Sequence, residues 1–188
     1  MVKALLIVDV QRDFCEGGSL AVEGGTAVAS ELSSWVGYDR AGGAYHYVVA
    51  CKDWHIDPGE HFAPAGSEPD FETIWPVHCV AESEGAKFSP ALQVALDEIF
   101  LKGRHTASYT AFDGEANEQS LTDWLLTREV TALDIVGLAT DHCVKASALD
   151  AVAAGFATTV LTNYCAGVAP STTKAALTDM KSAGINLS

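Results

Sequence analysis

The architecture of this chain turns on one octapeptide, Gly137-Leu138-Ala139-Thr140-Asp141-His142-Cys143-Val144. The apolar, β-branched run at residues 132–136 precedes it and predicts a buried strand. Apolar residues at helical spacing follow it as far as Gly155, and glycine commonly stands just past a helix end. We therefore expect a strand-to-helix turn here, with Thr140 or Asp141 capping a helix over residues 142–154.

Cys143 falls in the first turn of that predicted helix. The free backbone N–H groups and the positive dipole end of a helix favour a thiolate over a thiol at that position. A cysteine placed there is suited to attack an electrophile. A small buried cysteine that only packs the turn would explain this residue alone equally well, so the interpretation depends on its neighbours.

Reactive side chains also follow three other predicted strands, at residues 4–8, 47–50 and 98–101. Asp9 comes after the first strand, Asp53 shortly after the second and Lys102 after the third. The strands alternate with predicted helices, which indicates parallel strands joined by crossover helices. Because ligands of such sheets bind beyond the carboxyl ends of the strands, we expect these side chains to meet there. The remaining expected elements are helices at residues 25–36, 89–95, 118–127 and 171–183 and strands at 158–161 and 185–187.

Composition limits the possible classes of protein. The length of 188 residues, 48% of them hydrophobic, predicts one globular domain over residues 1–188. The net charge of −14 argues against nucleic acid or an anionic membrane as a partner. No apolar run approaches the ~20 residues that span a bilayer. We expect no signal peptide, and the five cysteines lack paired spacing, which favours reduced thiols in the cytoplasm.

The irregular segment over residues 53–87 carries three of the six histidines. The candidate metal ligands are Asp53, His55, His61 and His78. One carboxylate and three imidazoles suit a single Fe2+, Mn2+ or Zn2+ ion. Alternative ligands are Asp57, Glu60 and Cys79. Asp53 is preferred because it leaves the end of a strand, where a rigid element holds its geometry. The alternative interpretation is a set of scattered surface histidines.

Asp9 and Lys102 supply what a cysteine nucleophile lacks. A carboxylate can accept the thiol proton, and an ammonium group can stabilise the thiolate. Each residue also has an ordinary interpretation, a turn cap for Asp9 and a solvated lysine for Lys102. His142 is a less suitable partner for Cys143, because adjacent helical residues do not face each other.

Several motifs together resemble one family over nearly the whole chain. They are Val8-Asp9-Val10-Gln11-Arg12-Asp13-Phe14, Lys52-Asp53-Trp54-His55, Trp75-Pro76-Val77-His78-Cys79, Lys102-Gly103 and residues 137–144. In order and spacing they resemble the isochorismatase-like cysteine hydrolases and, among these, the metal-bearing nicotinamidase/pyrazinamidase group. Arg12 stands where many relatives carry asparagine, and no catalytic role is assigned to this position.

The resemblance implies a three-layer α/β/α fold with a mostly parallel six-stranded sheet. It implies a catalytic triad of Asp9, Lys102 and Cys143. It also implies a non-proline cis peptide bond at Leu138–Ala139 and an oxyanion hole from the N–H groups of Ala139 and Cys143. The implied ligands of one divalent ion are Asp53, His55, His61 and His78. The implied substrate contacts are Phe14, Trp75, Tyr109 and His142.

The activity that the resemblance implies is hydrolysis of nicotinamide to nicotinate and ammonia in NAD salvage, and of pyrazinamide to pyrazinoate. The reaction would pass through a thioester on Cys143, with a ring nitrogen of the substrate held by the metal. The protein is expected to be a monomer or a small homo-oligomer. Two alternatives are a related hydrolase of another amide, carbamoyl group or vinyl ether, and a non-catalytic metal-binding or thiol-sensing domain.

Overall fold

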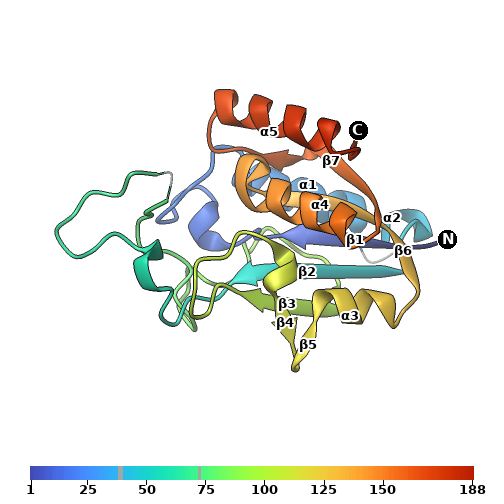
Figure 1. Cartoon of the computed structure of the whole chain (residues 1–188), viewed down its shortest axis with the longest axis horizontal. Coiled ribbons are helices and arrows are strands. Elements are labelled where there is room, and N and C mark those ends of the chain that lie inside the picture. The colour runs from blue at the N-terminus through green and yellow to red at the C-terminus, as the bar shows by residue number, and fades with distance from the viewer. Residues whose placement is uncertain (38–39, 72) are drawn as a thin grey trace.

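A twisted sheet forms the middle of the protein in the computed structural model, which describes residues 1–37, 40–71 and 73–188 (Figure 1). Within these residues the strand order is β5-β4-β3-β2-β1-β6-β7-β8. The strands are β1 Val2–Val8, β2 Tyr47–Asp53, β3 Glu98–Lys102, β4 Glu115–Ala116, β5 Gln119–Ser120, β6 Val130–Leu138, β7 Ala157–Ala166 and β8 Asn186–Leu187. The six expected strands are present and mutually parallel, and the two short strands β4 and β5 add an antiparallel edge.

Helices cover both faces of this sheet, which confirms the three-layer prediction. They are α1 Gly25–Val36, α2 Arg40–Gly43, α3 Leu121–Leu126, α4 Lys145–Ala153 and α5 Pro170–Ser182. The expected helices at residues 25–36 and 171–183 are therefore present, within a residue at each end. Among the described residues, no helix has the length and apolar character needed to cross a bilayer.

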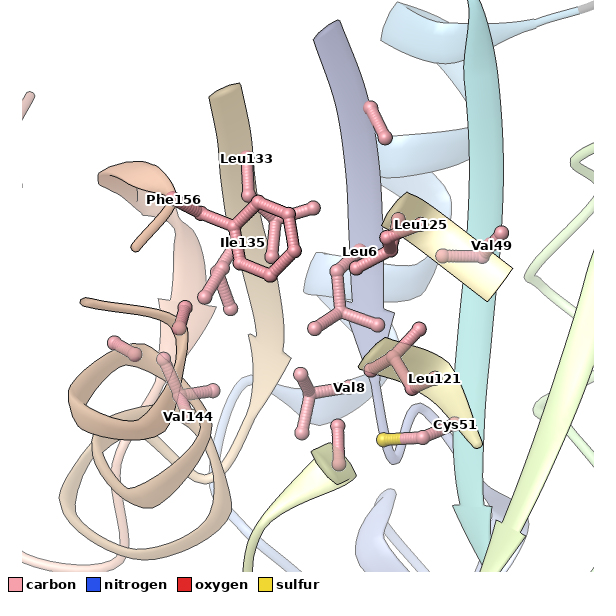
Figure 2. Packing of buried hydrophobic residues seen from close by; sticks show 14 of the residues in the cluster. Leu6, Val8, Val49, Cys51, Leu121, Leu125, Leu133, Ile135, Val144 and Phe156 are labelled. Carbon is pink, nitrogen blue, oxygen red and sulfur yellow. The ribbon is translucent and has the colours of Figure 1, made fainter. Parts of the chain in front are cut away.

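Strand β1 shows how the two cores form. Its side chains alternate between the faces, and all of them from Ala4 to Val8 are fully buried. Leu6 and Val8 pack with Leu121 of α3 in one cluster (Figure 2). Leu5 and Ile7 pack against α1 in the other. Burial on both faces is typical of the central strand of a parallel sheet.

Two predicted helices differ in the structure. Residues 89–95 form no helix, because Ser33 Oγ of α1 donates to Ala91 O at 2.6 Å and accepts from Gln93 N at 2.6 Å. These contacts replace the hydrogen bonds that a helix would make internally. The helix expected at residues 118–127 is only α3, since Gln119 and Ser120 pair with β4 instead.

The helix expected over residues 142–154 is divided. A π-helical turn over residues 140–144 comes first, and α4 follows it. The predicted cap is wrong, since no side chain caps the turn. Asp141 instead accepts hydrogen bonds from Val168 N at 3.0 Å and Ala169 N at 3.4 Å, at the start of α5. Its carboxylate therefore connects the turn over residues 140–144 to the segment that precedes α5.

Strand register brings the reactive residues to one edge of the sheet. Val8 lies opposite both Cys51 of β2 and Gly137 of β6, and Asp53 lies opposite Lys102. Gly137 has φ +119°, and a Cβ there would lie 2.1 Å from Val8 O. Only glycine allows β6 to approach β1 this closely, so the turn that carries Cys143 lies directly beside Asp9.

Candidate active site and metal centre

Three charged side chains meet in the interior at the carboxyl ends of β1, β2 and β3. Lys102 Nζ lies 2.9 Å from Asp9 Oδ2 and 2.6 Å from Asp53 Oδ1. It lies 3.6 Å from Cys143 Sγ and also donates to the carbonyl of Ser108 at 3.3 Å. Buried charges are tolerated only when they are paired and hydrogen-bonded, as here. The ordinary interpretations of Asp9 as a turn cap and Lys102 as a solvated lysine do not describe this arrangement.

The two carboxyl groups differ in proton affinity. Burial would lower the pKa of Lys102, but Asp53 and Asp9 outweigh it and raise that pKa well above its usual value, so the amine is charged. Burial raises the pKa of Asp53, yet Lys102 and His55 hold it well below its ordinary range. Burial also raises the pKa of Asp9, and at Asp9 this effect exceeds the opposing effect of Lys102. Asp9 is therefore the carboxylate that can take up a proton.

The surroundings of Cys143 oppose the thiolate that the start of a helix favours. Burial raises the pKa of the Cys143 sulfur well above its ordinary value, and the negative Asp9 and Asp53 raise it further. Lys102 lowers it, but not enough to offset the loss of water. The sulfur therefore needs a base before it can attack, and Asp9 is the adjacent group that can act as one.

Three buried histidines gather beside this cluster. Donor atoms of His55, His61 and His78 lie within 4.8 Å of one another. Asp53 Oδ2 lies 3.6 Å from His55 Nε2 and 3.9 Å from His78 Nε2. The four candidate ligands thus occupy one region, at the end of β2 and in the loop that follows it. They are not scattered surface histidines.

Backbone carbonyls orient two of these rings. His55 Nδ1 contacts Gly103 O at 2.6 Å, and His78 Nδ1 contacts Pro76 O at 2.7 Å. Such contacts fix the tautomer and turn the opposite nitrogen, Nε2, toward the shared centre. Gly103 has φ +68°, and a Cβ there would lie 2.7 Å from His55 Cε1, so glycine is required for this contact.

The donor set fits a divalent transition metal ion. His55 Nε2 and His61 Nδ1 are buried and have no hydrogen-bond partner in the described part of the chain. Burial, together with the neighbouring histidines, lowers the pKa of His61 to about 4, and burial also lowers that of His78. Neutral imidazoles with free lone pairs beside an ionised carboxylate suit Zn2+, Fe2+ or Mn2+.

The alternative ligands are less well placed. Asp57 and Glu60 are exposed to solvent. Cys79 is buried in the apolar cluster under α1, and its backbone N–H donates to Asp13 Oδ2 at 2.7 Å. None of the three belongs to either group of atoms that approach one another within metal-binding range among the described residues. Asp53 is the favoured carboxylate, because its Oδ2 lies 3.6 Å from His55 Nε2 and 3.9 Å from His78 Nε2.

An aromatic cavity joins the cysteine to the histidines. The expected substrate contacts all line it, namely Phe14, Trp75, Tyr109 and His142. Trp75 Nε1 donates to Tyr109 Oη at 2.8 Å, and the Trp75 and His142 rings are 5.1 Å apart. Ala139 and Cys143 form part of the wall, and the Leu138–Ala139 peptide bond is cis, as expected. These groups line the cavity with aromatic and imidazole rings.

Gln11 is a site residue to which the sequence assigned no role. Its Nε2 donates to Asp53 O at 2.8 Å and to Ala86 O at 3.0 Å, while its Oε1 accepts from Asp53 N at 2.8 Å. The amide thus fixes the backbone of a candidate ligand. In the sequence, the signal that could have identified Gln11 as a site residue was its position two residues after Asp9, just beyond a buried strand.

Comparison with known proteins agrees with this geometry. The chain is 48% identical to the nicotinamidase/pyrazinamidase of Mycobacterium tuberculosis, over 99% of this chain and 98% of that protein. It is 40% identical to the nicotinamidase of Escherichia coli, over 98% and 93% of the two chains. The structure of Pyrococcus horikoshii pyrazinamidase in complex with zinc matches with a TM-score of 0.82 at 32% identity, covering 100% of this chain and 99% of that one. The isochorismatase domain family matches residues 3–188, and this chain belongs to that family.

Proposed function

We propose that this chain, acting as one domain over residues 1–188, hydrolyses nicotinamide to nicotinate and ammonia, and pyrazinamide to pyrazinoate. One observation carries the proposal: Cys143, with Lys102 and Asp9 buried beside it, lines an aromatic cavity together with histidines suited to a metal. Relatives named for these two activities are similar over nearly the whole chain. The reaction would serve NAD salvage.

Substrate orientation comes first in this proposal. Asp53 and the three histidines would hold one Zn2+, Fe2+ or Mn2+ ion, which when bound supplies an electrophilic position for a ring nitrogen. Phe14 and Trp75 would enclose the ring, and Tyr109 would hold the Trp75 indole in place through their hydrogen bond. The carboxamide then lies over Cys143, so that binding orients the reacting atoms.

Acylation begins with transfer of the Cys143 thiol proton to Asp9. The sulfur attacks the carboxamide carbon, and a C–S bond forms while negative charge moves to the oxygen. The N–H groups of Ala139 and Cys143 are proposed to stabilise that oxyanion. Lys102 stabilises the negative charge on the sulfur as it develops. The C–N bond then breaks, and Asp9 gives its proton to the departing ammonia.

Deacylation repeats the cycle with water. Asp9 takes a proton from the water as its oxygen attacks the thioester carbon. The C–S bond breaks, nicotinate leaves, and Asp9 returns the proton to the sulfur. One carboxyl group with a raised pKa thus serves both half-reactions, alternating between base and acid.

Ammonia release from nicotinamide, pyrazinamide and benzamide tests the proposal. We expect turnover of the first two and much slower turnover of benzamide, which has the same shape as nicotinamide but no ring nitrogen. Equal rates on nicotinamide and benzamide would contradict the role of the metal. No turnover of any of them, with turnover of another small amide, would favour a different hydrolase of the family. Absence of all turnover would favour a binding domain.

We also propose that the protein works in the cytoplasm. The five cysteines are free thiols without disulfide partners among the described residues. Reduced thiols of this kind persist where glutathione and thioredoxin keep the compartment reducing. Fractionation of cells, followed by detection of the protein with an antibody, tests the location.

A further inference from the structure

A second buried thiol contacts Asp9, in addition to that of Cys143. Cys51 Sγ donates a hydrogen bond to Asp9 Oδ1 at 3.3 Å, and both residues are fully buried. The backbone carbonyl of Cys51 also accepts from Asp9 N at 3.2 Å. The chemistry proposed above uses Asp9 and Cys143 but assigns nothing to this sulfur.

The strand register explains why Cys51 reaches Asp9. It stands opposite Val8 in the parallel pair of β1 and β2, one residue before the carboxylate. Its side chain lies on the same face of the sheet as Leu121 of α3 (Figure 2). A buried carboxylate oxygen without a donor is costly, and the Cys51 thiol donates to Asp9 Oδ1.

The two oxygens of Asp9 therefore have different partners. Oδ2 lies 2.9 Å from Lys102 Nζ, and Oδ1 accepts from the Cys51 thiol. With Lys102 ion-paired to one oxygen and the Cys51 S–H hydrogen-bonded to the other, the carboxylate cannot turn partway about its Cβ–Cγ bond without weakening one of these contacts. The Cys51 hydrogen bond thus selects one orientation of the group that must exchange protons with Cys143.

We propose that Cys51 is a positioning residue for the amide hydrolysis, whose S–H holds Asp9 with Oδ2 directed toward Lys102 and Cys143. This inference rests on the proposed function, because orientation of Asp9 affects rate only if Asp9 carries protons. It predicts that a hydroxyl donor at position 51 can replace the thiol. It also predicts that an apolar side chain of the same shape cannot.

The matched pair Cys51→Thr and Cys51→Val tests this directly. Threonine and valine have nearly the same volume, and only threonine has a donor. We expect Cys51→Thr to retain kcat for nicotinamide within about threefold, and Cys51→Val to lose about 10- to 100-fold, as for a lost hydrogen bond to a charged group. KM should change little in both, since Cys51 does not line the substrate cavity. Cys165→Val is the control, because that thiol donates to the carbonyl of Leu161 and should tolerate the change.

Each possible outcome of the comparison between the two variants either supports or overturns the role proposed for Cys51. Equal kcat values for the valine and threonine variants would overturn the proposal, whether both are active or both are slow. If the thermal unfolding midpoint shows that valine disrupts the fold, the smaller pair Cys51→Ser and Cys51→Ala makes the same comparison. Should the parent protein fail to hydrolyse nicotinamide, the proposed function fails, and alkylation of Cys143 by iodoacetamide becomes the readout. That reaction forms an S–C bond, releases iodide and needs Asp9 to take the proton, so Cys51→Val should slow it and Cys51→Thr should not.

Discussion

Replacing Lys102 by methionine should lower the free energy of unfolding by about 3–5 kcal/mol at neutral pH. Methionine has a similar length but no charge, so Asp9 and Asp53 would be left facing each other without a cation. The lysine makes two contacts with carboxylates, at 2.9 and 2.6 Å, and all three side chains are almost completely buried. Each contact to a charged group is worth about 1.5–3 kcal/mol, and the sum agrees with the cost of breaking a buried ion pair.

Urea unfolding with a chelator present measures this effect, since no divalent ion then compensates the carboxylates. Lys145→Met is the matched control, because its contact with Asp179 is also 2.6 Å long but the two side chains are 29% and 56% exposed. An exposed pair contributes about 0–1 kcal/mol. A loss at Lys102 no larger than the loss at Lys145 would refute the reasoning.

The pH dependence gives a second check on the same variant. The pKa of Asp9 in the folded protein is already raised by burial, and removal of Lys102 should raise it further. The folded variant then binds a proton at a pH where its unfolded chain does not, so its unfolding free energy falls as pH rises through that raised pKa. The difference from the parent should therefore be largest at neutral pH and shrink in mild acid.

Three further outcomes are expected. Cys143→Ala should abolish ammonia release while circular dichroism and the unfolding midpoint stay unchanged, and residual turnover by this variant would exclude a thioester. Asp9→Asn should lower kcat about 10²- to 10⁴-fold in steady-state assays, because an amide cannot carry the proton; a change below tenfold would assign that role elsewhere. His61→Ala should remove the bound metal and the activity together, as measured by metal analysis, whereas the exposed His105→Ala should remove neither. Because the pKa of His61 lies at about 4 in the folded protein against 6.5 ordinarily, the unfolding free energy of the metal-free protein should fall as pH decreases across that interval, a slope that His61→Ala should reduce.

Local patterns in the sequence were enough to predict the sheet and the residues at its edge. Alternating strands and helices imply parallel strands, and parallel strands all present their carboxyl ends on one side. Asp9, Asp53, Lys102 and Cys143 could therefore be assigned to one edge before their distances were known. The histidines of the loop could be assigned to the same edge, because they lie close in sequence to the end of β2. Such features depend only on chain order and on the period of the hydrophobic pattern.

Features that depend on distant neighbours were decided by the tertiary structure alone. The dipole argument favours a thiolate at Cys143, but burial among side chains from several strands raises the pKa of the sulfur. Asp141 accepts hydrogen bonds from the residues just before α5 rather than capping its own helix, since that segment lies beside it only after folding. Gln11 and Cys51 act on Asp53 and Asp9 across strand pairs, 42 residues apart in the chain in both cases. Hydrogen bonds and desolvation depend on distances in space, and a one-dimensional pattern carries no record of those distances.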